Sequence, residues 1–223
     1  MKKIVLTLLA AIAVTCIWAQ QPLCPVKEGV SLLYVMKDAK GKVKNYSRQT
    51  VTLVEGSGNN LTITYLSEAL DAKKKPLANA PVISYTTRVE NGAVVIDPKS
   101  ILNSISTAFP TDGAAEGTPM ILPANMKAGD KLPDCEMKMQ ITVFYINASY
   151  TNGVCEGEEQ ITTAAGTFLC KKTKYDFKSS AGIIKSNGVI HTWYAPGVGV
   201  VKQEMFNNKG KLNTYQELVE LSK

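Results

Sequence analysis

The stretch 157–172, GEEQITTAAGTFLCKK, holds the densest set of side chains that could do chemistry. It has adjacent carboxylates at Glu158 and Glu159, several hydroxyls, a small-residue turn and Cys170. Adjacent side chains of a strand point to opposite faces, so the two glutamates cannot act as acid and base on one substrate. Glu156 and Glu158 share a face, but no apolar neighbour stands beside them to raise a pKa. The stretch therefore predicts a β-hairpin with solvated glutamates.

His191 is the single histidine, so any nucleophile that needs an imidazole base would have to use it. It lies in the strand pattern VIHTWY and shares a face with Trp193, which favours a packing or surface role. The spacing of a zinc site and the ligand pattern of a calcium loop are both missing. We therefore expect a protein that is not an enzyme and has no metal or cofactor. A hydrolase is the disfavoured alternative and would need carboxylates from distant strands, such as Glu158 with Glu204 or Asp176.

The N-terminus has the pattern of a secretory signal peptide. Lys2 and Lys3 precede an uncharged run over residues 4–19, which is shorter than the about 18 residues of a membrane span. We predict that residues 1–19 are removed and that the chain is exported to the periplasm or secreted. A lipoprotein anchored through Cys16 is the disfavoured alternative, because the residues before it fit a lipobox poorly.

Four cysteines remain in residues 20–223: Cys24, Cys135, Cys155 and Cys170. An even number in an exported chain favours disulfides. Of the three possible pairings we prefer Cys155–Cys170, which closes a short loop, together with Cys24–Cys135. No CxxC motif suggests a redox role.

The formal charge of +6 is mild and includes Lys2 and Lys3. The lysine runs at 73–75 and 171–174 fall in a loop and beside strand residues. A nucleic-acid binder would show a basic stripe with interleaved aromatic residues, so we expect no nucleic-acid partner.

From Val30 onward, β-prone runs alternate with turns. The clearest hairpin is VISYTTRVENGAVVI, 82–96, around Asn91-Gly92, which suits a type I′ turn. One helix is predicted over 98–109, with Asp97 as cap and Pro98 in its first position. Residues 110–134 are rich in proline and glycine and are expected to form a long irregular loop.

These patterns predict an all-β, mostly antiparallel fold: a single curved sheet, half-barrel or barrel of about ten strands with one short helix. Residues 20–223 would form a single β-rich domain. The pieces DAKGKVKNY (38–46) and NNKGKLNTY (207–215) are alike. Either Lys-Gly-Lys is simply a good hairpin turn, or the first and last strands pair and close a barrel.

Alternation in MKMQITVFY, 137–145, places Met137, Met139 and Tyr145 on one face of a strand. Together with Trp193 they are the predicted lining of a ligand pocket. The alternative is that they are ordinary core residues.

Four segments together resemble a known family: AGDKLPD (128–134), GEEQITTAAGTFLCKK (157–172), WYAPGVGVVKQE (193–204) and GKLNTYQELVELS (210–222). They resemble the TapB-like family of exported bacterial β-proteins over most of residues 26–222. The resemblance implies a mostly antiparallel, curved sheet or half-barrel in the cell envelope. It brings no established activity and no catalytic residues.

We therefore expect an exported, non-catalytic envelope protein that binds a lipid or another apolar or amphiphilic small molecule in a barrel-like cavity. The alternative is a structural or interaction module that meets an envelope protein through a surface or strand edge. An aromatic patch of Tyr46, Tyr65 and Tyr85 would suit that alternative. The oligomeric state is left open.

Overall fold

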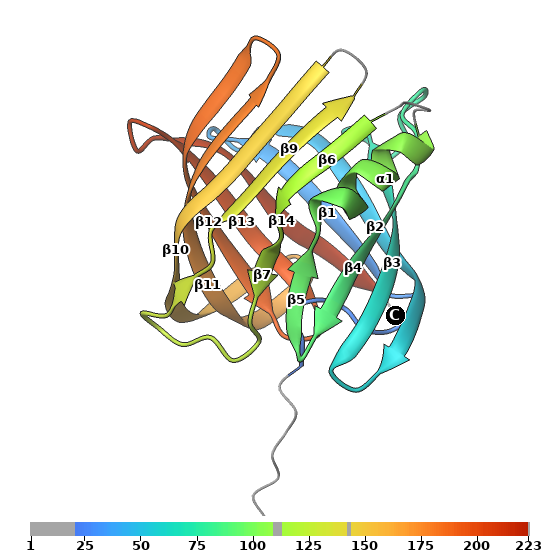
Figure 1. The fold of residues 1–223 in the computed structure, drawn as a ribbon, viewed down its shortest axis with the longest axis vertical. Coiled ribbons are helices and arrows are strands. Elements are labelled where there is room, and N and C mark those ends of the chain that lie inside the picture. The colour runs from blue at the N-terminus through green and yellow to red at the C-terminus, as the bar shows by residue number, and fades with distance from the viewer. Residues whose placement is uncertain (1–20, 109–112, 142–143, 223) are drawn as a thin grey trace, which may run out of the picture.

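The computed structural model describes residues 21–108, 113–141 and 144–222. Its strands form one antiparallel sheet that curls into a nearly closed barrel (Figure 1). The fold class is confirmed, with fourteen strands in place of about ten. The strands are β1 (Ser31–Asp38), β2 (Val43–Ser57), β3 (Asn60–Leu70), β4 (Ile83–Glu90), β5 (Ala93–Ile96), β6 (Gly113–Thr118), β7 (Met120–Leu122), β8 (Lys131–Leu132), β9 (Cys135–Ile141), β10 (Phe144–Thr163), β11 (Gly166–Ala181), β12 (Ile184–Ala195), β13 (Gly199–Asn207) and β14 (Leu212–Ser222).

The first and last strands lie side by side in the middle of the sheet. The strand order is β6-β9-β10-β11-β12-β13-β14-β1-β2-β3-β4-β5-β7, and β1 pairs with β14 with Tyr34 opposite Leu218. Of the two explanations for the similar Lys-Gly-Lys segments, the structure therefore supports the second, because the first and last strands do pair. The strand order ends with β6 on one side and β7 on the other. Both strands lie within residues 110–134, which were predicted to form an irregular loop, so that prediction is wrong for these strands.

The helix α1 (Pro98–Ala108) lies at the seam between β4 and β6 (Figure 1). It begins as the sequence predicts, because the Asp97 carboxylate accepts a hydrogen bond from the Lys99 N–H at 2.8 Å. Leu102 is buried and packs toward the backbone of Gly113 on β6, where an added Cβ would meet its methyl groups. The helix thus covers the gap that the sheet leaves between its two ends.

The predicted hairpin around Asn91-Gly92 is confirmed. It joins β4 and β5, and both turn residues have positive φ, 51° and 83°. Asparagine and glycine tolerate this conformation, so the turn is determined locally.

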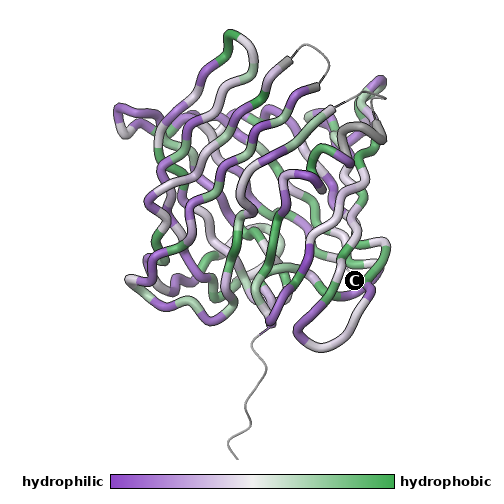
Figure 2. Tube along the Cα trace, in the orientation of Figure 1, coloured by the Kyte–Doolittle hydropathy of each residue, from purple (hydrophilic) through white to green (hydrophobic). Residues whose placement is uncertain are grey.

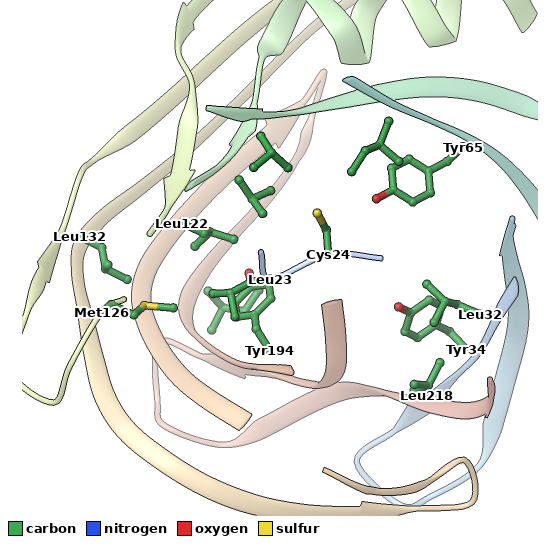
Figure 3. Close-up of a cluster of buried hydrophobic side chains, with 14 of the residues drawn as sticks. Leu23, Cys24, Leu32, Tyr34, Tyr65, Leu122, Met126, Leu132, Tyr194 and Leu218 are labelled. Atoms are coloured by element: carbon green, nitrogen blue, oxygen red, sulfur yellow. The ribbon is translucent and has the colours of Figure 1, made fainter. Parts of the chain in front are cut away.

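The barrel interior is filled by side chains from opposite walls and by the segment 22–30. The Gly197 N–H donates to the carbonyl oxygen of Pro22 at 2.8 Å, and the Gly29 N–H donates to that of Val51 at 2.9 Å. The segment therefore crosses the barrel from the β12–β13 turn to β2. Leu23 and Cys24 lie in its centre, among Tyr34, Tyr65 and Tyr194 (Figure 3).

A smaller apolar cluster lies apart from this interior, on the other face of β10–β13. Its buried members are Ile161, Cys170, Trp193, Ala195 and Val201. Along most strands hydrophilic and hydrophobic residues alternate (Figure 2), as expected of a sheet with two different faces. Within the described residues, no helix has the length and apolar character needed to cross a membrane.

Candidate functional site

The structure does not bring the four predicted pocket residues together. Trp193 is 4% exposed and packs in the cluster with Cys170 and Val201, whereas Met139 lies on β9 opposite Ile146. Tyr145 lies opposite Gln140 and is 59% exposed. The sequence predicted one strand over 137–145, but β9 ends at Ile141 and β10 begins at Phe144. Tyr145 therefore belongs to the next strand and does not share the face of Met137 and Met139.

The two predicted disulfides are not formed. Cys24, Cys135, Cys155 and Cys170 are all free and buried. Cys155 lies opposite Thr173 on β11, and Cys170 comes three positions before Thr173, an odd spacing that puts it on the other face. Cys24 lies on the central segment and hydrogen-bonds Tyr65. The Cys155–Cys170 disulfide was predicted because it would close a short loop. Loop length does not determine the face of the strand from which each thiol projects.

The proposed aromatic surface patch is also absent. Tyr65 and Tyr85 are stacked inside the barrel, with ring centroids 4.9 Å apart. Tyr46 lies away from them, beneath the Lys74 ammonium group at 5.5 Å.

Glu159 of the opening stretch and Glu156 just before it belong to a polar cluster around Trp193, which also includes Lys172, His191 and Lys202. The Trp193 Nε1–H donates to Glu159 at 2.8 Å. The Lys172 and Lys202 ammonium groups lie 5.2 and 5.1 Å from the Trp193 ring, within cation–π distance. This Trp193 cluster joins β10, β11, β12 and β13 on the outer face.

His191 and Glu156 form a carboxylate–imidazole pair in the Trp193 cluster. The His191 Nδ1 lies 3.2 Å from the Glu156 carboxylate, and Lys172 Nζ lies 3.1 Å from it. Burial acts to raise the Glu156 pKa, but Lys172 and His191 outweigh it and hold that pKa below its ordinary value. Acid–base catalysis needs a nucleophile or water path beside such a pair. The nearby Cys170 is buried, its thiol contacts the Phe168 carbonyl oxygen, and burial raises its pKa to about 12.

The carboxylates named for a hydrolase each have their own partner. Glu158 pairs with the buried Lys171 at 2.7 Å, and Glu204 pairs with Lys202 at 2.7 Å. Asp176 accepts a hydrogen bond from the Asn152 amide at 2.8 Å. These contacts fit stabilising roles. In the part of the chain that the structure describes, no group of three potential metal ligands comes together.

A groove of about 480 Å³ lies over β9, β10, β11 and β12. Of the four predicted pocket residues it contains Met137; sequence reasoning missed the rest, because the lining comes from four strands and forms no motif. We call it the β9–β12 groove; it is lined by residues 136–138, 147–149, 178–180 and 185–187. Two cross-strand rows supply most of this lining: Lys138, Asn147, Ser180 and Lys185 in one, and Glu136, Ser149, Lys178 and Asn187 in the other.

Two lysines of the β9–β12 groove have no acidic partner within the described residues. Among the ion pairs of the described residues, none involves Lys178 or Lys185, and Lys138 reaches Glu116 only at 4.0 Å. Lys178 on β11 lies opposite Asn187 on β12. Asn187 is two residues after Lys185, so Lys178 and Lys185 are diagonal neighbours. The two ammonium groups are therefore on one face, where like charges repel unless an anion lies between them.

The fold and the groove define a class: an antiparallel, barrel-like β-protein with a basic groove on one part of its wall, lined by lysine, serine and asparagine residues together with Met137 and Ala148. The chain belongs to the DUF3108-like family, whose model matches residues 27–218. The resemblance to an uncharacterised family of β-proteins is thereby confirmed, while the TapB-like name finds no support. A comparison with curated proteins finds no match.

Two solved structures share the fold. One is a Bacteroides fragilis protein described as a "putative exported protein with YmcC-like fold", with a TM-score of 0.74 and 23% identity over 91% of this chain and 100% of that one. The other is described as a "putative lipoprotein" of Parabacteroides distasonis, with a TM-score of 0.73 and 21% identity over 91% of this chain and 99% of that one. At these identities the likeness concerns the fold.

Proposed function

We propose that this is an exported, non-catalytic binding protein of the cell envelope, and that its β9–β12 groove holds the anionic, hydroxyl-bearing part of an amphiphilic molecule. Export is supported by the predicted signal peptide, which lies outside the described residues, and by the descriptions of the two structural relatives. The observation that carries the ligand class is a pair of lysines, Lys178 and Lys185, that form no ion pair with any described carboxylate and line a groove of about 480 Å³.

The chemistry of the groove lining supports a polar ligand group. Ammonium groups attract phosphate or carboxylate oxygens, and serine hydroxyls and asparagine amides can both donate and accept hydrogen bonds. The two cross-strand rows of the groove offer three lysines, two serines and two asparagines, with Glu136 as the acidic residue. A purely apolar ligand would leave these groups without partners.

The centre of the barrel is a poor place for a ligand. Leu23 and Cys24 occupy it and are 2% and 6% exposed (Figure 3). A ligand there would have to displace the segment 22–30 and its backbone hydrogen bonds to Gly197 and Val51. The groove on the wall needs no such rearrangement.

The test is native mass spectrometry of the chain exported from a bacterial host, followed by lipid extraction and titration with soluble dihexanoyl-phosphatidylglycerol. We expect a bound anionic amphiphile and saturable binding of the probe. The variant Lys138→Gln/Lys178→Gln/Lys185→Gln should weaken binding about a hundredfold, at roughly 1 kcal/mol for each of the three lysine contacts. The control Lys40→Gln/Lys209→Gln/Lys211→Gln removes the same charge from exposed sites outside the groove and should bind normally.

Equal binding by the two triple variants, or an apo mass without probe binding, would reject the groove as the site. The alternative function, an interaction module, rests on the strand edge of β6, Gly113–Thr118, which ends the strand order of the sheet. A protein that binds no amphiphile and forms a defined oligomer would favour this alternative.

The intact mass also tests the anchor. Cleavage after Ala19 removes Cys16, whereas anchoring through Cys16 keeps that residue and adds acyl chains. Because one structural relative is described as a lipoprotein, anchoring is the alternative to free export.

A further inference from the structure

The tip of the β11–β12 hairpin exposes an apolar surface that folding leaves unused. Ile183 is 98% exposed and Ile184 is 71% exposed. The turn is closed by Gly182, which has a positive φ of 58° and donates to the Tyr145 carbonyl oxygen. The hairpin reaches beyond the barrel and is hydrophobic at its tip (Figure 2).

A single exposed aliphatic side chain is common on protein surfaces, but this tip differs in two ways. The two isoleucines are adjacent at the end of a two-stranded finger, and a third large side chain, Tyr145, is 59% exposed on the neighbouring strand. An aromatic ring with a polar hydroxyl is the type of side chain that lies at the boundary of lipid tails and headgroups.

Basic residues lie directly behind the apolar tip. Lys185 follows Ile184 in the sequence, and Lys178 and Lys138 line the same β9–β12 groove. An apolar tip with Lys185 next to it and Lys178 of β11 four residues before Gly182 matches the order of layers in a bilayer, with acyl chains inside and anionic headgroups outside. The match in charge and polarity is the reason to prefer a membrane as the partner.

The shape of the tip points the same way. A stable protein–protein interface takes roughly 20–30 residues on each side. The narrow end of one hairpin offers far fewer, whereas insertion into a lipid surface needs only a few apolar side chains together with electrostatic attraction.

We propose that the β11–β12 tip docks the protein onto membranes that contain anionic lipids, with Ile183 and Ile184 inserted below the headgroups and Lys178 and Lys185 beside the lipid phosphates. The proposed contact between the two lysines and lipid phosphates rests on the proposed function of the groove. The proposed insertion into the acyl chains rests on Ile183 and Ile184 alone. The segment 22–30 contacts the β12–β13 turn at the opposite end of the barrel (Figure 1), so the tip points away from the start of the described chain.

The test is flotation of residues 20–223 with vesicles of phosphatidylcholine containing 30% phosphatidylglycerol, compared with pure phosphatidylcholine. We expect binding that prefers the anionic vesicles. The variant Ile183→Ser/Ile184→Ser should lower the partition coefficient about tenfold or more, because the inserted apolar area is removed. The control Leu77→Ser/Val82→Ser changes two exposed apolar residues of the β3–β4 loop and should bind as the unmodified protein does.

Insertion has a direct readout in the variant Ile183→Trp made on a Trp193→Phe background. Its fluorescence should shift to the blue and be quenched by brominated acyl chains. Absence of vesicle binding, equal binding by the Ile183→Ser/Ile184→Ser variant, or an unquenched Trp at position 183 would each overturn the proposal. If the Ile183→Ser/Ile184→Ser variant no longer binds vesicles but still binds soluble dihexanoyl-phosphatidylglycerol, the proposed ligand binding by the groove holds independently of membrane docking.

Discussion

At the scale of single residues, the chemistry that stood out in the sequence proves to hold strands together. Glu156 and Glu159 lie on β10, and their partners Lys172, His191 and Trp193 lie on β11 and β12. The contacts cross strand boundaries, which is where side chains contribute most to sheet stability. The stretch is a β-hairpin, as predicted, and these side-chain contacts stabilise the outer face of the long β10–β11 pair.

Removing the Trp193 hydrogen bond should weaken this support. Trp193→Phe keeps an aromatic ring but removes the indole N–H and part of the buried ring, so we expect a loss of at least about 1 kcal/mol in the free energy of unfolding. A double-mutant cycle with Glu159→Gln, followed by urea denaturation and circular dichroism, measures the coupling between the two side chains. Additive effects of the two substitutions would show that the bond contributes nothing.

The lowered pKa of Glu156 predicts a pH dependence. Its ordinary value is 4.5, and the folded protein holds it lower through Lys172 and His191. The stabilisation is therefore present above about pH 4.5 and is lost as the pH falls through the lower folded value. We expect Glu156→Gln to be less stable than the unmodified protein at pH 7, with the difference shrinking towards pH 3.

Chemical denaturation at pH 7, 5, 4 and 3 checks this expectation. Glu55→Gln is the control, since it removes one exposed carboxylate outside the Trp193 cluster. A stability difference for Glu156→Gln that stays constant from pH 7 to pH 3 would contradict the assignment.

Because the four cysteines are buried, we expect their thiols to react slowly with thiol reagents. Burial raises the pKa of Cys24 and of Cys170 to about 12, and the thiolate is the reactive form. We expect residues 20–223 to react negligibly with Ellman's reagent at pH 8 when folded and to release four equivalents in guanidinium chloride. Fewer than four equivalents without a reductant would restore the disulfide hypothesis.

At the scale of elements, the segment 22–30 acts as a core element although it has no regular secondary structure. It contributes Leu23, Cys24 and Val30 to the buried cluster. Because the barrel is wide, its walls alone leave space in the centre, and this segment fills it (Figure 3).

We therefore expect Leu23→Ala to cost about 2–4 kcal/mol in the free energy of unfolding, a typical loss for a large side chain removed from a core. Leu53→Ala, an exposed leucine of β2, should cost less than about 1 kcal/mol. Urea denaturation of both variants checks the contrast, and similar losses would mean that the segment does not contribute to the core.

At the scale of the whole molecule, the sheet is joined through its first and last strands. β14 pairs with both β13 and β1, so it connects the β9–β13 side to the β2–β5 side. Stability of the complete barrel thus depends on contacts between the two ends of the sequence, and such contacts are slow to form.

Truncation after Gly210 tests this dependence. Removing β14 leaves β1 and β13 with unpaired edges and should abolish cooperative unfolding, as measured by circular dichroism and by the dispersion of amide signals in NMR spectra. A matched truncation that removes only Ser222 and Lys223 should keep the fold. A folded, cooperative chain after the longer truncation would show that the two halves are independent.

Sequence by itself determined the features whose causes are local. The Asn91-Gly92 turn, the helix that Asp97 caps and the all-β class follow from residues within a few positions of each other. The tertiary structure decided which face of each strand looks inward, because strand breaks and bulges, such as those at Thr151/Val154 and Cys155/Gly157, shift the alternation of faces. For that reason Trp193 and Tyr145 do not lie in the predicted pocket, the thiols lie apart, and lysines of three strands, β9, β11 and β12, line one groove.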